Sequence, residues 1–311
     1  PIELARENGM DSDWKSVDRP TPAFLGRRVV DDVTVDDLRP FIDWTMFFSA
    51  WDLKGRYPKI LEHEKHGEAA RELFENAQTL LDRIAREGLL TLRGVYGFWK
   101  AAADGDDVIL YGEDGAETRF PMLRQQAVKH GDQPYWSLAD FVAPVSTGLP
   151  DHVGAFAVTA GLGADTLAQA FEADHDDYQA IMVKALADRL AEAFAEYLHA
   201  RARRDWGYGD DEDLDHDDLI AERYRGIRPA FGYPACPDHV LKGPLFDLLA
   251  AREVGMELTE HFAMTPAASV SGLYFAHPES RYFGVGKVGR DQVADYATRL
   301  GTTPEEVERW I

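Results

Sequence analysis

A stretch without any glycine or proline runs from Asp165 to Asp205. Large apolar residues recur in it three and four positions apart, which places them on one side of a 3.6-residue repeat. Glycine and proline are the residues that most often end a helix, so nothing interrupts this pattern. The sequence therefore predicts one long core helix whose apolar stripe must pack against another element. The stripe comprises Tyr178, Ile181, Met182, Ala185, Leu186, Leu190, Ala193, Phe194, Tyr197 and Leu198.

Other segments predict strands as well as helices. Residues 62–86 repeat apolar positions at helical spacing, and two short helices are expected at the end of the chain. Apolar residues 94–99 and 108–111 flank Asp104-Gly105-Asp106, which is typical of a β-hairpin. Hairpins and helices in separate blocks predict an α+β fold with an antiparallel sheet. Further strands are expected at residues 154–159, 269–275 and 281–288.

Composition excludes several classes of function. The 311 residues carry a net charge of −22, and a surface this acidic repels phosphate backbones, so no nucleic-acid partner is expected. No run of 18 apolar residues occurs, so no membrane span is expected. The single cysteine, Cys236, cannot form an internal disulfide, which favours a reducing, cytoplasmic location.

The N-terminal segment differs from the rest of the chain. Residues 1–26 are polar and contain Pro20 and Pro22, a pattern typical of a linker or an extended arm. The sequence does not begin with methionine, so we expect a piece of a longer protein. We therefore predict a linker or arm over residues 1–32 and one domain over residues 33–311.

The segment from Arg228 to Pro237 is the strongest candidate for a binding site. It contains three prolines and one glycine in ten residues, which fixes an irregular backbone. Glycine allows a backbone to approach a ligand closely, and Arg228 could hold a carboxylate through two parallel hydrogen bonds. The alternative is a rigid turn with Arg228 in a surface ion pair.

Four other side chains are candidates, each with a structural alternative. Tyr282 and Phe283 could stack on a flat ring or contact a cation, or they could be ordinary strand residues. Asp43 lies in an aromatic patch and could accept an amine or a hydroxyl, or it could cap a helix. Glu192 could reach a ligand from the long helix or be a solvated flank residue.

Three other patterns carry no function. Residues 284–289 match GxGxxG, but the chain ends at Ile311 without the second parallel strand that a dinucleotide fold needs. Cys236 and His239 lack the further ligands of a zinc site, so no metal is expected. No general base is identifiable beside Cys236, so no catalytic residue is predicted.

The run from Arg225 to His239 is similar to the hallmark of the activation domain of cobalamin-dependent methionine synthase. That family typically has proline where this chain has Phe231. The resemblance covers roughly residues 33 to 311, and further segments match in the same order. These are Phe41–Thr45, Gly55–Pro58, Leu138–Pro144, Gly154–Thr159, His175–His199, Phe262–Met264 with Ser269–Gly272, and Val307–Trp310.

The resemblance implies a C-shaped α+β domain, with a bent antiparallel sheet and flanking helices, that binds S-adenosylmethionine in a shallow groove. Such a domain presents the methyl group to cob(I)alamin, which is regenerated from inactive cob(II)alamin by an electron from flavodoxin or a flavoprotein reductase. This step reactivates methionine synthase, the methyltransferase that methylates homocysteine. The implied partner is the cobalamin-binding domain, which would precede residues 1–32. The domain alone would turn nothing over.

The resemblance also implies roles for single residues. Arg228 would hold the methionine carboxylate, and Ala230, Gly232 and Tyr233 would give backbone and ring contacts to the ligand. Tyr282 and Phe283 fall on the family's aromatic pair, whose second member is often tyrosine. Asp43 and Glu192 would meet the amino group or the ribose, while Asp188 would face the cobalamin domain. Phe231 could reshape the groove locally.

Two other functions stay open at this point. The chain could be an interaction module that docks cobalamin and flavin proteins without binding S-adenosylmethionine. It could also be a self-sufficient methyltransferase with its own small acceptor, although the sequence offers no general base for one.

Overall fold

The computed structural model describes residues 1–129, 131 and 133–311, and its framework is an antiparallel sheet. Five strands follow one another in the order β4-β3-β2-β5-β8, and β1 pairs with residues 94–98 in the middle of β2. This arrangement confirms the predicted α+β class with an antiparallel sheet. The strands are β1 (Gly26–Val30), β2 (Thr91–Asp104), β3 (Asp107–Tyr111), β4 (Glu117–Pro121), β5 (Asp151–Leu162) and β8 (Ser269–Tyr274).

The predicted hairpin joins β2 and β3. Gly105 at its turn has φ +60°, a conformation that costs glycine little, and Asp104 pairs directly with Asp107. Along β2, alternate side chains enter different cores: Tyr96 packs in one cluster and Val95 in another. The sheet is therefore buried on both faces, which explains why its central strands lack a simple polar–apolar alternation.

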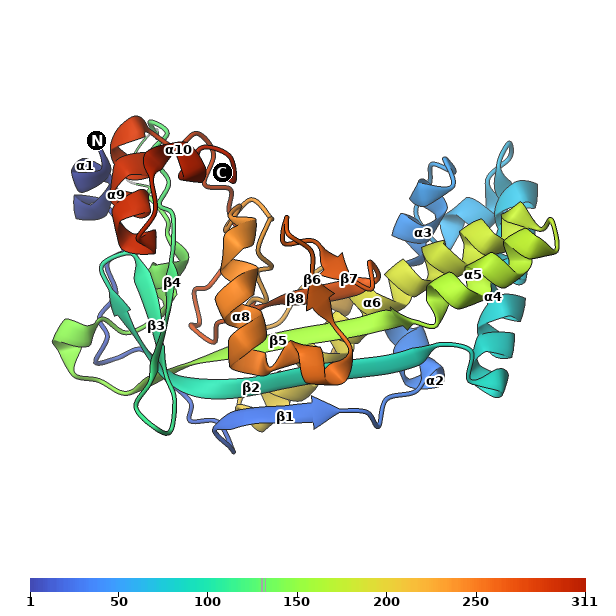
Figure 1. The fold of residues 1–311 in the computed structure, drawn as a ribbon, viewed down its shortest axis with the longest axis horizontal. Helices are drawn as coiled ribbons and strands as arrows, with labels where there is room; N and C mark the ends of the chain where they lie inside the picture. Colours follow the sequence, from blue (N-terminus) through green and yellow to red (C-terminus); the bar gives the residue numbers. More distant parts are fainter. Residues whose placement is uncertain (130, 132) are drawn as a thin grey trace.

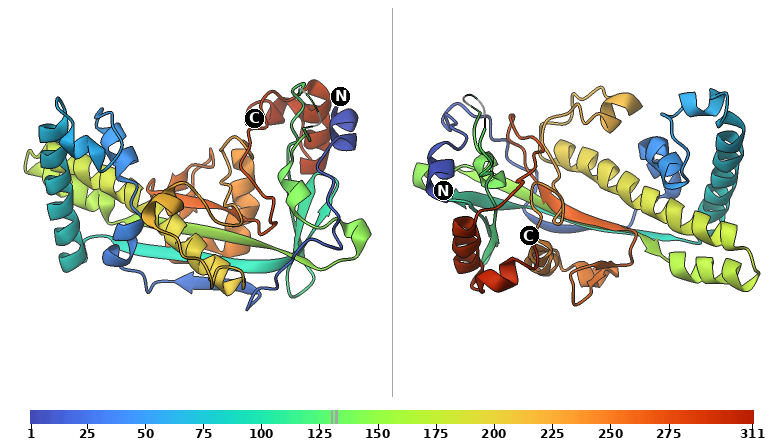
Figure 2. Two further views of the ribbon diagram at one scale, coloured as in Figure 1. Left: turned by 180° about the vertical axis from the view of Figure 1, so that it is seen from behind. Right: turned by 90° about the horizontal axis from the view of Figure 1, so that it is seen from above.

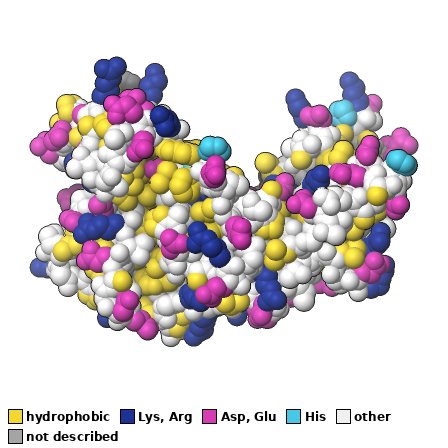
Figure 3. All heavy atoms as spheres, viewed as in Figure 1, with side chains coloured by type: hydrophobic (Ala, Val, Ile, Leu, Met, Phe, Trp, Pro, Cys, Tyr) yellow, Lys and Arg dark blue, Asp and Glu magenta, His cyan; other side chains and the backbone are white. Residues whose placement is uncertain are grey.

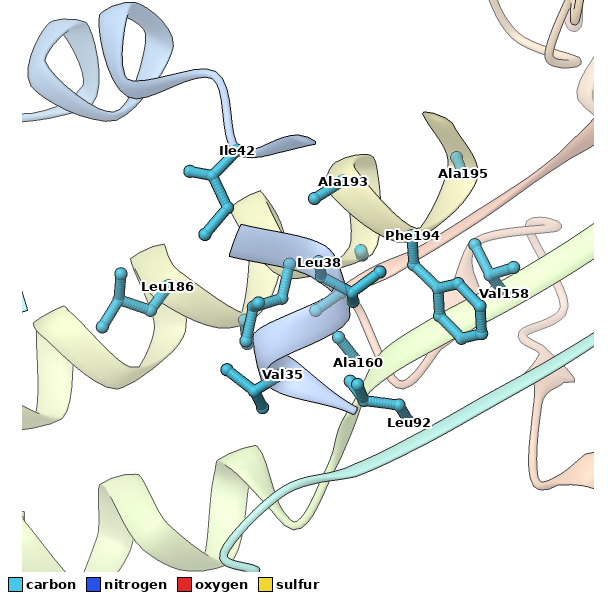
Figure 4. Close-up of a cluster of buried hydrophobic side chains, with 14 of the residues drawn as sticks. Val35, Leu38, Ile42, Leu92, Val158, Ala160, Leu186, Ala193, Phe194 and Ala195 are labelled. Carbon is cyan, nitrogen blue, oxygen red and sulfur yellow. The ribbon is translucent and has the colours of Figure 1, made fainter. Parts of the chain in front are cut away.

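Helix α6 (Asp177–Asp205) lies across one face of the sheet. Most of its apolar stripe meets α2 (Val35–Leu38) and the strands, and Figure 4 shows Phe194 of α6 beside Val158 of β5. This confirms the predicted core helix over most of its length. Tyr178 and Ile181, which were predicted as part of the stripe, are exposed at the start of the helix. The same cluster includes residues of α3 (Trp44–Ala50), α4 (Gly67–Glu87) and α5 (Ala164–Ala173).

Helix α8 (Lys242–Leu249) covers the opposite face, where Leu245, Phe246 and Leu249 are buried in a second core. A third, smaller cluster lies under α9 (Arg290–Leu300) and α10 (Pro304–Val307). The remaining elements are α1 (Ile2–Glu7), α7 (His216–Ile220) and the two-residue strands β6 (Glu257–Leu258) and β7 (Met264–Thr265), which pair with each other.

The elements at the two ends of the long strands project to the same side, so the molecule has a C-shaped outline (Figure 1). Helices α3, α4 and α5 form one end, and α1, α9 and α10 form the other (Figures 1 and 2). Hydrophobic side chains gather beside the hollow between these ends, while charges of both signs are spread around it (Figure 3). None of the helices that the structure describes is long and apolar enough to cross a membrane.

Three predicted elements differ from the structure. The long helix is interrupted after α5, where His175 takes φ +60° and Asp176 caps α6. Residues 281–288 form no strand, so that prediction was wrong. The N-terminal segment is not extended throughout, because it begins with α1, and its end joins the sheet as β1.

The N-terminal helix is held against α9 and the β2–β3 turn by ion pairs of partly buried side chains. Arg6 pairs with Asp106 at 2.8 Å and with Asp295 of α9 at 2.7 Å. Asp106 also accepts from Arg124 at 2.6 Å, and its side chain is almost completely buried. A buried ion pair is costly unless each charge is compensated, and here each carboxylate meets a guanidinium. These contacts explain why a polar segment of the sequence is ordered against the domain.

Candidate functional site

The segment that begins at Arg228 runs beside β8. Ile227 and Phe275 exchange backbone hydrogen bonds of 3.1 and 3.0 Å, and the amide of Leu273 donates to the carbonyl of Pro229 at 3.1 Å. The chain then leaves the strand, because Pro229 and Pro234 have no backbone N–H to continue a ladder. Arg228 is thereby held at a defined place next to the sheet.

The loop after Pro229 closes on itself through its backbone. The carbonyl of Ala230 accepts from the amide of Tyr233 at 3.2 Å and from the thiol of Cys236 at 3.1 Å. The amide of Gly232 donates to the carbonyl of Cys236 at 2.9 Å. Gly232 has φ +97°, and a Cβ there would collide with the imidazole of His239. Only glycine fits this turn without strain, which fixes the shape of the loop.

Residues 282–285 form the opposite wall. The phenol oxygen of Tyr282 accepts from the backbone amide of Arg228 at 3.0 Å, and the amide of Val285 donates to the carbonyl of Pro234 at 2.8 Å. The backbone of this segment therefore bonds to the proline loop rather than to a strand. This is the physical reason why the predicted strand over residues 281–288 does not form.

A cleft of about 510 Å³ lies between the two walls. Six of the eight residues predicted from the sequence line it: Glu192, Arg228, Ala230, Tyr233, Tyr282 and Phe283. They come from α6, the proline loop and the 282–284 segment, so residues distant in sequence converge on one hollow. A pocket of this size with aromatic walls and a few charged groups is typical of a site for a small molecule.

The guanidinium of Arg228 is surrounded by acceptors. Its Nη2 lies 2.7 Å from a carboxylate oxygen of Glu196, its Nη1 lies 3.4 Å from Glu222, and Nη1 also donates to the hydroxyl of Tyr224. Burial opposes the charged form, but Glu196, Tyr224, Tyr282 and Glu222 together outweigh it and raise the pKa of Arg228. The side chain is still 16% exposed and lines the cleft, so it is not sealed inside the protein.

Two further carboxylates face the cleft, from Glu192 and Glu222. Burial raises the pKa of Glu222, with a smaller opposing effect from Arg228. The negative charge of Glu192 raises the pKa of Tyr233, whose side chain is 58% exposed. Burial raises the pKa of Tyr282 to about 12, so this residue stays a neutral hydroxyl. The cleft thus combines one guanidinium with several acids, which suits a ligand that carries both signs of charge.

Comparison with known proteins identifies the family. Residues 34–301 match the family model described as "Vitamin B12 dependent methionine synthase, activation domain". The chain belongs to this family. It is also similar to the solved structure titled "Crystal Structure of the MetH Reactivation Domain bound to AdoHcy", with 50% sequence identity and a TM-score of 0.96. The match covers 100% of this chain and 96% of that one, so the resemblance inferred from the sequence is confirmed over the whole fold.

Two predicted site residues of this activation domain do not line the cleft. Asp43 caps α3, accepting from the amides of Thr45 at 2.9 Å and Met46 at 3.2 Å. This is the structural alternative that its sequence context left open. Gly232 supports the loop through its backbone instead of facing the hollow. Direct contact of either residue with a ligand stays a prediction.

Phe231, which stands where the family typically has proline, does not line the cleft. Its side chain is 2% exposed and stacks on Phe120, with ring centroids 5.7 Å apart, in the core on the α8 side of the sheet. In this activation domain Phe231 therefore attaches the proline loop to the core on the α8 side of the sheet. Asp188, expected to face a neighbouring domain, is exposed on α6.

The sequence did not indicate three polar residues that contact Arg228: Glu222, which lines the cleft, and Glu196 and Tyr224, which lie behind the guanidinium. Glu222 and Tyr224 lie in a short stretch without hydrophobic periodicity, where no pattern indicates which side chains turn inward. Glu196 lies one turn of helix after Glu192, and this spacing was a usable signal. Cys236 is buried, and burial raises its pKa, so its thiol is no nucleophile. Among the described residues, no group of three or more metal-ligating side chains occurs.

Proposed function

We propose that the cleft of this activation domain binds S-adenosylmethionine and presents its methyl group to cobalamin held by a neighbouring domain. The observation that carries the proposal is the convergence of the six predicted residues on one hollow. The solved reactivation domain supports it, because that protein was crystallised with AdoHcy and shares half of its sequence with this chain. AdoHcy differs from S-adenosylmethionine by the methyl group alone.

The charges of the cleft match the parts of the proposed ligand. The methionine end carries a carboxylate, which Arg228 would hold through charge-assisted hydrogen bonds. The ammonium and the sulfonium are cationic, and Glu192 and Glu222 offer carboxylates to them. The adenine ring is flat and suits the aromatic side chains of Tyr233 and Tyr282. Each part of the ligand thus has a chemically suitable partner among the lining residues.

The protein contributes position rather than acid–base chemistry. When bound by its own domain, cobalamin supplies the nucleophilic metal that accepts the methyl group. The residues of this chain bind S-adenosylmethionine, orient its sulfonium and hold it at the hollow of the C-shaped domain. Residues 1–32 would lead from the cobalamin-binding domain, and flavodoxin or a flavoprotein reductase would supply the electron. The isolated chain is expected to transfer no methyl group by itself.

Titration calorimetry with S-adenosylmethionine tests the proposal. Arg228→Ala should weaken binding about 10- to 100-fold, because a hydrogen-bonded charge pair contributes about 1.5–3 kcal/mol. Arg225→Ala is the matched control, since Arg225 lies three residues earlier and pairs with Asp18 outside the cleft. Equal affinity of the wild type and Arg228→Ala would remove Arg228 from the site.

Two results would favour the rival functions. Failure of the wild type to bind S-adenosylmethionine, with docking to a cobalamin-binding domain retained, would indicate a pure interaction module. Methyl transfer by the isolated chain to a small acceptor would indicate a self-sufficient methyltransferase.

A further inference from the structure

Arg228 is held from behind by two side chains that do not line the cleft. Glu196 of α6 reaches Nη2 at 2.7 Å, and the hydroxyl of Tyr224 accepts from Nη1. The side chain of Glu196 is 9% exposed, so this contact is shielded from water. Different residues therefore lie on the two sides of the guanidinium: the cleft is on one side, and Glu196 and Tyr224 are on the other.

Tyr224 is itself fixed by a further layer of contacts. Its hydroxyl donates to Glu196 at 3.2 Å, and its ring lies 3.8 Å below the guanidinium of Arg203. Arg203 is completely buried and forms a two-pronged ion pair with Glu212, at 2.8 Å through both Nε and Nη2. The phenol cannot turn away from Arg228 without breaking these contacts. Glu196 and Tyr224 thus form a locked support.

A locked guanidinium binds a carboxylate better than a mobile one. A free arginine loses rotamer freedom when it clamps a ligand, whereas a guanidinium that is already fixed loses less. Guanidinium carries five N–H donors, so the contacts to Glu196, Tyr224 and Glu222 leave donors for a ligand. We propose that Glu196 and Tyr224 are positioning residues that orient Arg228 to receive the ligand carboxylate. This inference rests on the proposed function.

A simpler effect of charge makes the opposite prediction. If Glu196 acted only through its negative charge, it would compete with the ligand carboxylate and attract the ligand's cationic groups. Removing that charge would then favour carboxylate-bearing ligands over ligands without a carboxylate. Positioning predicts that its removal disfavours them. The two effects are distinguished by comparing S-adenosylmethionine with decarboxylated S-adenosylmethionine, which lacks only that group.

The experiment is calorimetric titration of the full chain with both compounds. The measured quantity is the Kd of the decarboxylated compound divided by the Kd of S-adenosylmethionine. Because both values come from the same variant, a general loosening of the cleft cancels in this ratio. The variants are Tyr224→Phe, which changes no charge, Glu196→Gln and Arg228→Ala. Tyr208→Phe is the control, since Tyr208 is a neighbouring, partly buried tyrosine that packs on Trp206 and Arg225. Thermal melting of each variant checks that it is folded.

In the wild type the ratio should be about ten or more, because the carboxylate contributes a charge-assisted hydrogen bond to binding. Tyr224→Phe and Glu196→Gln should lower the ratio about three- to tenfold, towards the value for Arg228→Ala, while Tyr208→Phe leaves it unchanged. An unchanged ratio in Tyr224→Phe, or a raised ratio in Glu196→Gln, overturns the positioning role and leaves the proposed function intact. A wild-type ratio that Arg228→Ala does not lower overturns the positioning role, because Arg228 would then not hold the carboxylate. Absence of S-adenosylmethionine binding in the wild type overturns both the positioning role and the proposed function.

Discussion

Replacing His199 with phenylalanine should remove part of the acid sensitivity of the fold. His199 lies on α6 behind Arg228, is 1% exposed, and stacks on Tyr274 with ring centroids 5.0 Å apart. Neither of its ring nitrogens has a hydrogen-bond partner among the described residues. Burial, reinforced by the positive charges of Arg203 and Arg228, lowers the pKa of His199 well below its ordinary value of 6.5.

The sign and size of the effect follow from proton linkage. Below pH 6.5 the unfolded chain binds a proton at His199 and the folded chain does not, so acid favours unfolding. The stability contribution is therefore fully present above pH 6.5 and is lost as the pH falls towards the lowered folded pKa. For one such group the free energy of unfolding falls by up to about 1.4 kcal/mol per pH unit. Phenylalanine keeps a ring against Tyr274 but cannot take up a proton.

Urea unfolding followed by circular dichroism, from neutral pH to about one unit below the ordinary histidine pKa, measures this slope. The slope of the free energy of unfolding against pH should be steeper in the wild type than in His199→Phe by about 1.4 kcal/mol per pH unit, which corresponds to one proton. His152 and His277, whose pKa values burial also lowers, are present in both proteins and cancel in the comparison. Parallel curves for the two proteins would show that His199 is protonated equally in both states, and the reasoning would fail.

Four further outcomes are expected. Asp43→Ala should lower the free energy of unfolding by about 1 kcal/mol, because the α3 cap is lost, whereas Asp43→Asn should keep the cap. If Asp43→Asn is as stable as the wild type but binds S-adenosylmethionine more weakly, Asp43 contacts the ligand. Gly232→Ala should lower stability by about 1–3 kcal/mol, measured by urea unfolding, and weaken ligand binding, because a Cβ collides with His239. Phe231→Ala should destabilise by about 3–5 kcal/mol in the same assay, and a loss below about 1 kcal/mol would contradict its place in the core. Burial raises the pKa of Glu222, so this carboxylate takes up a proton at a pH above the ordinary glutamate value of 4.5. Because the proposed cationic ligand needs that carboxylate, its affinity should already fall in this pH range. Calorimetry on Glu222→Gln should show a flatter pH dependence.

The elements that could be predicted are those with a local signal in the sequence, such as apolar residues at helical spacing or a turn motif. The stripe from Tyr178 to Leu198 has no glycine or proline and forms α6, and the turn signal at Gly105 forms the β2–β3 hairpin. The break at His175 was not predicted, because a φ of +60° is rare for residues other than glycine, and the helix-capping role of Asp176 is hidden in an acidic stretch. Residues 281–288 look like a strand but bond to the loop at Pro234, a partner that composition does not indicate.

The candidate site shows the same division. The proline loop and its arginine could be identified because Pro229, Gly232 and Pro234 restrict the backbone wherever they occur. Glu222 could not, because an acid in an irregular acidic stretch has no signal that separates a cleft residue from a solvated one. Its place depends on how residues 206–228 fold back along α6, and this is decided by buried contacts such as the one between Arg203 and Glu212.

The two central strands have a mechanical consequence. β2 contains 14 residues and β5 contains 12, and the two strands pair from Arg93 to Ala101 of β2 without an interruption. At about 3.3 Å per residue, β2 alone is about 46 Å long. A clamshell enzyme closes by bending at a thin hinge, but bending here would break many interstrand hydrogen bonds at once. The paired strands therefore connect the two ends of the C-shaped domain rigidly. We expect the width of the hollow between these ends to stay the same when a partner docks.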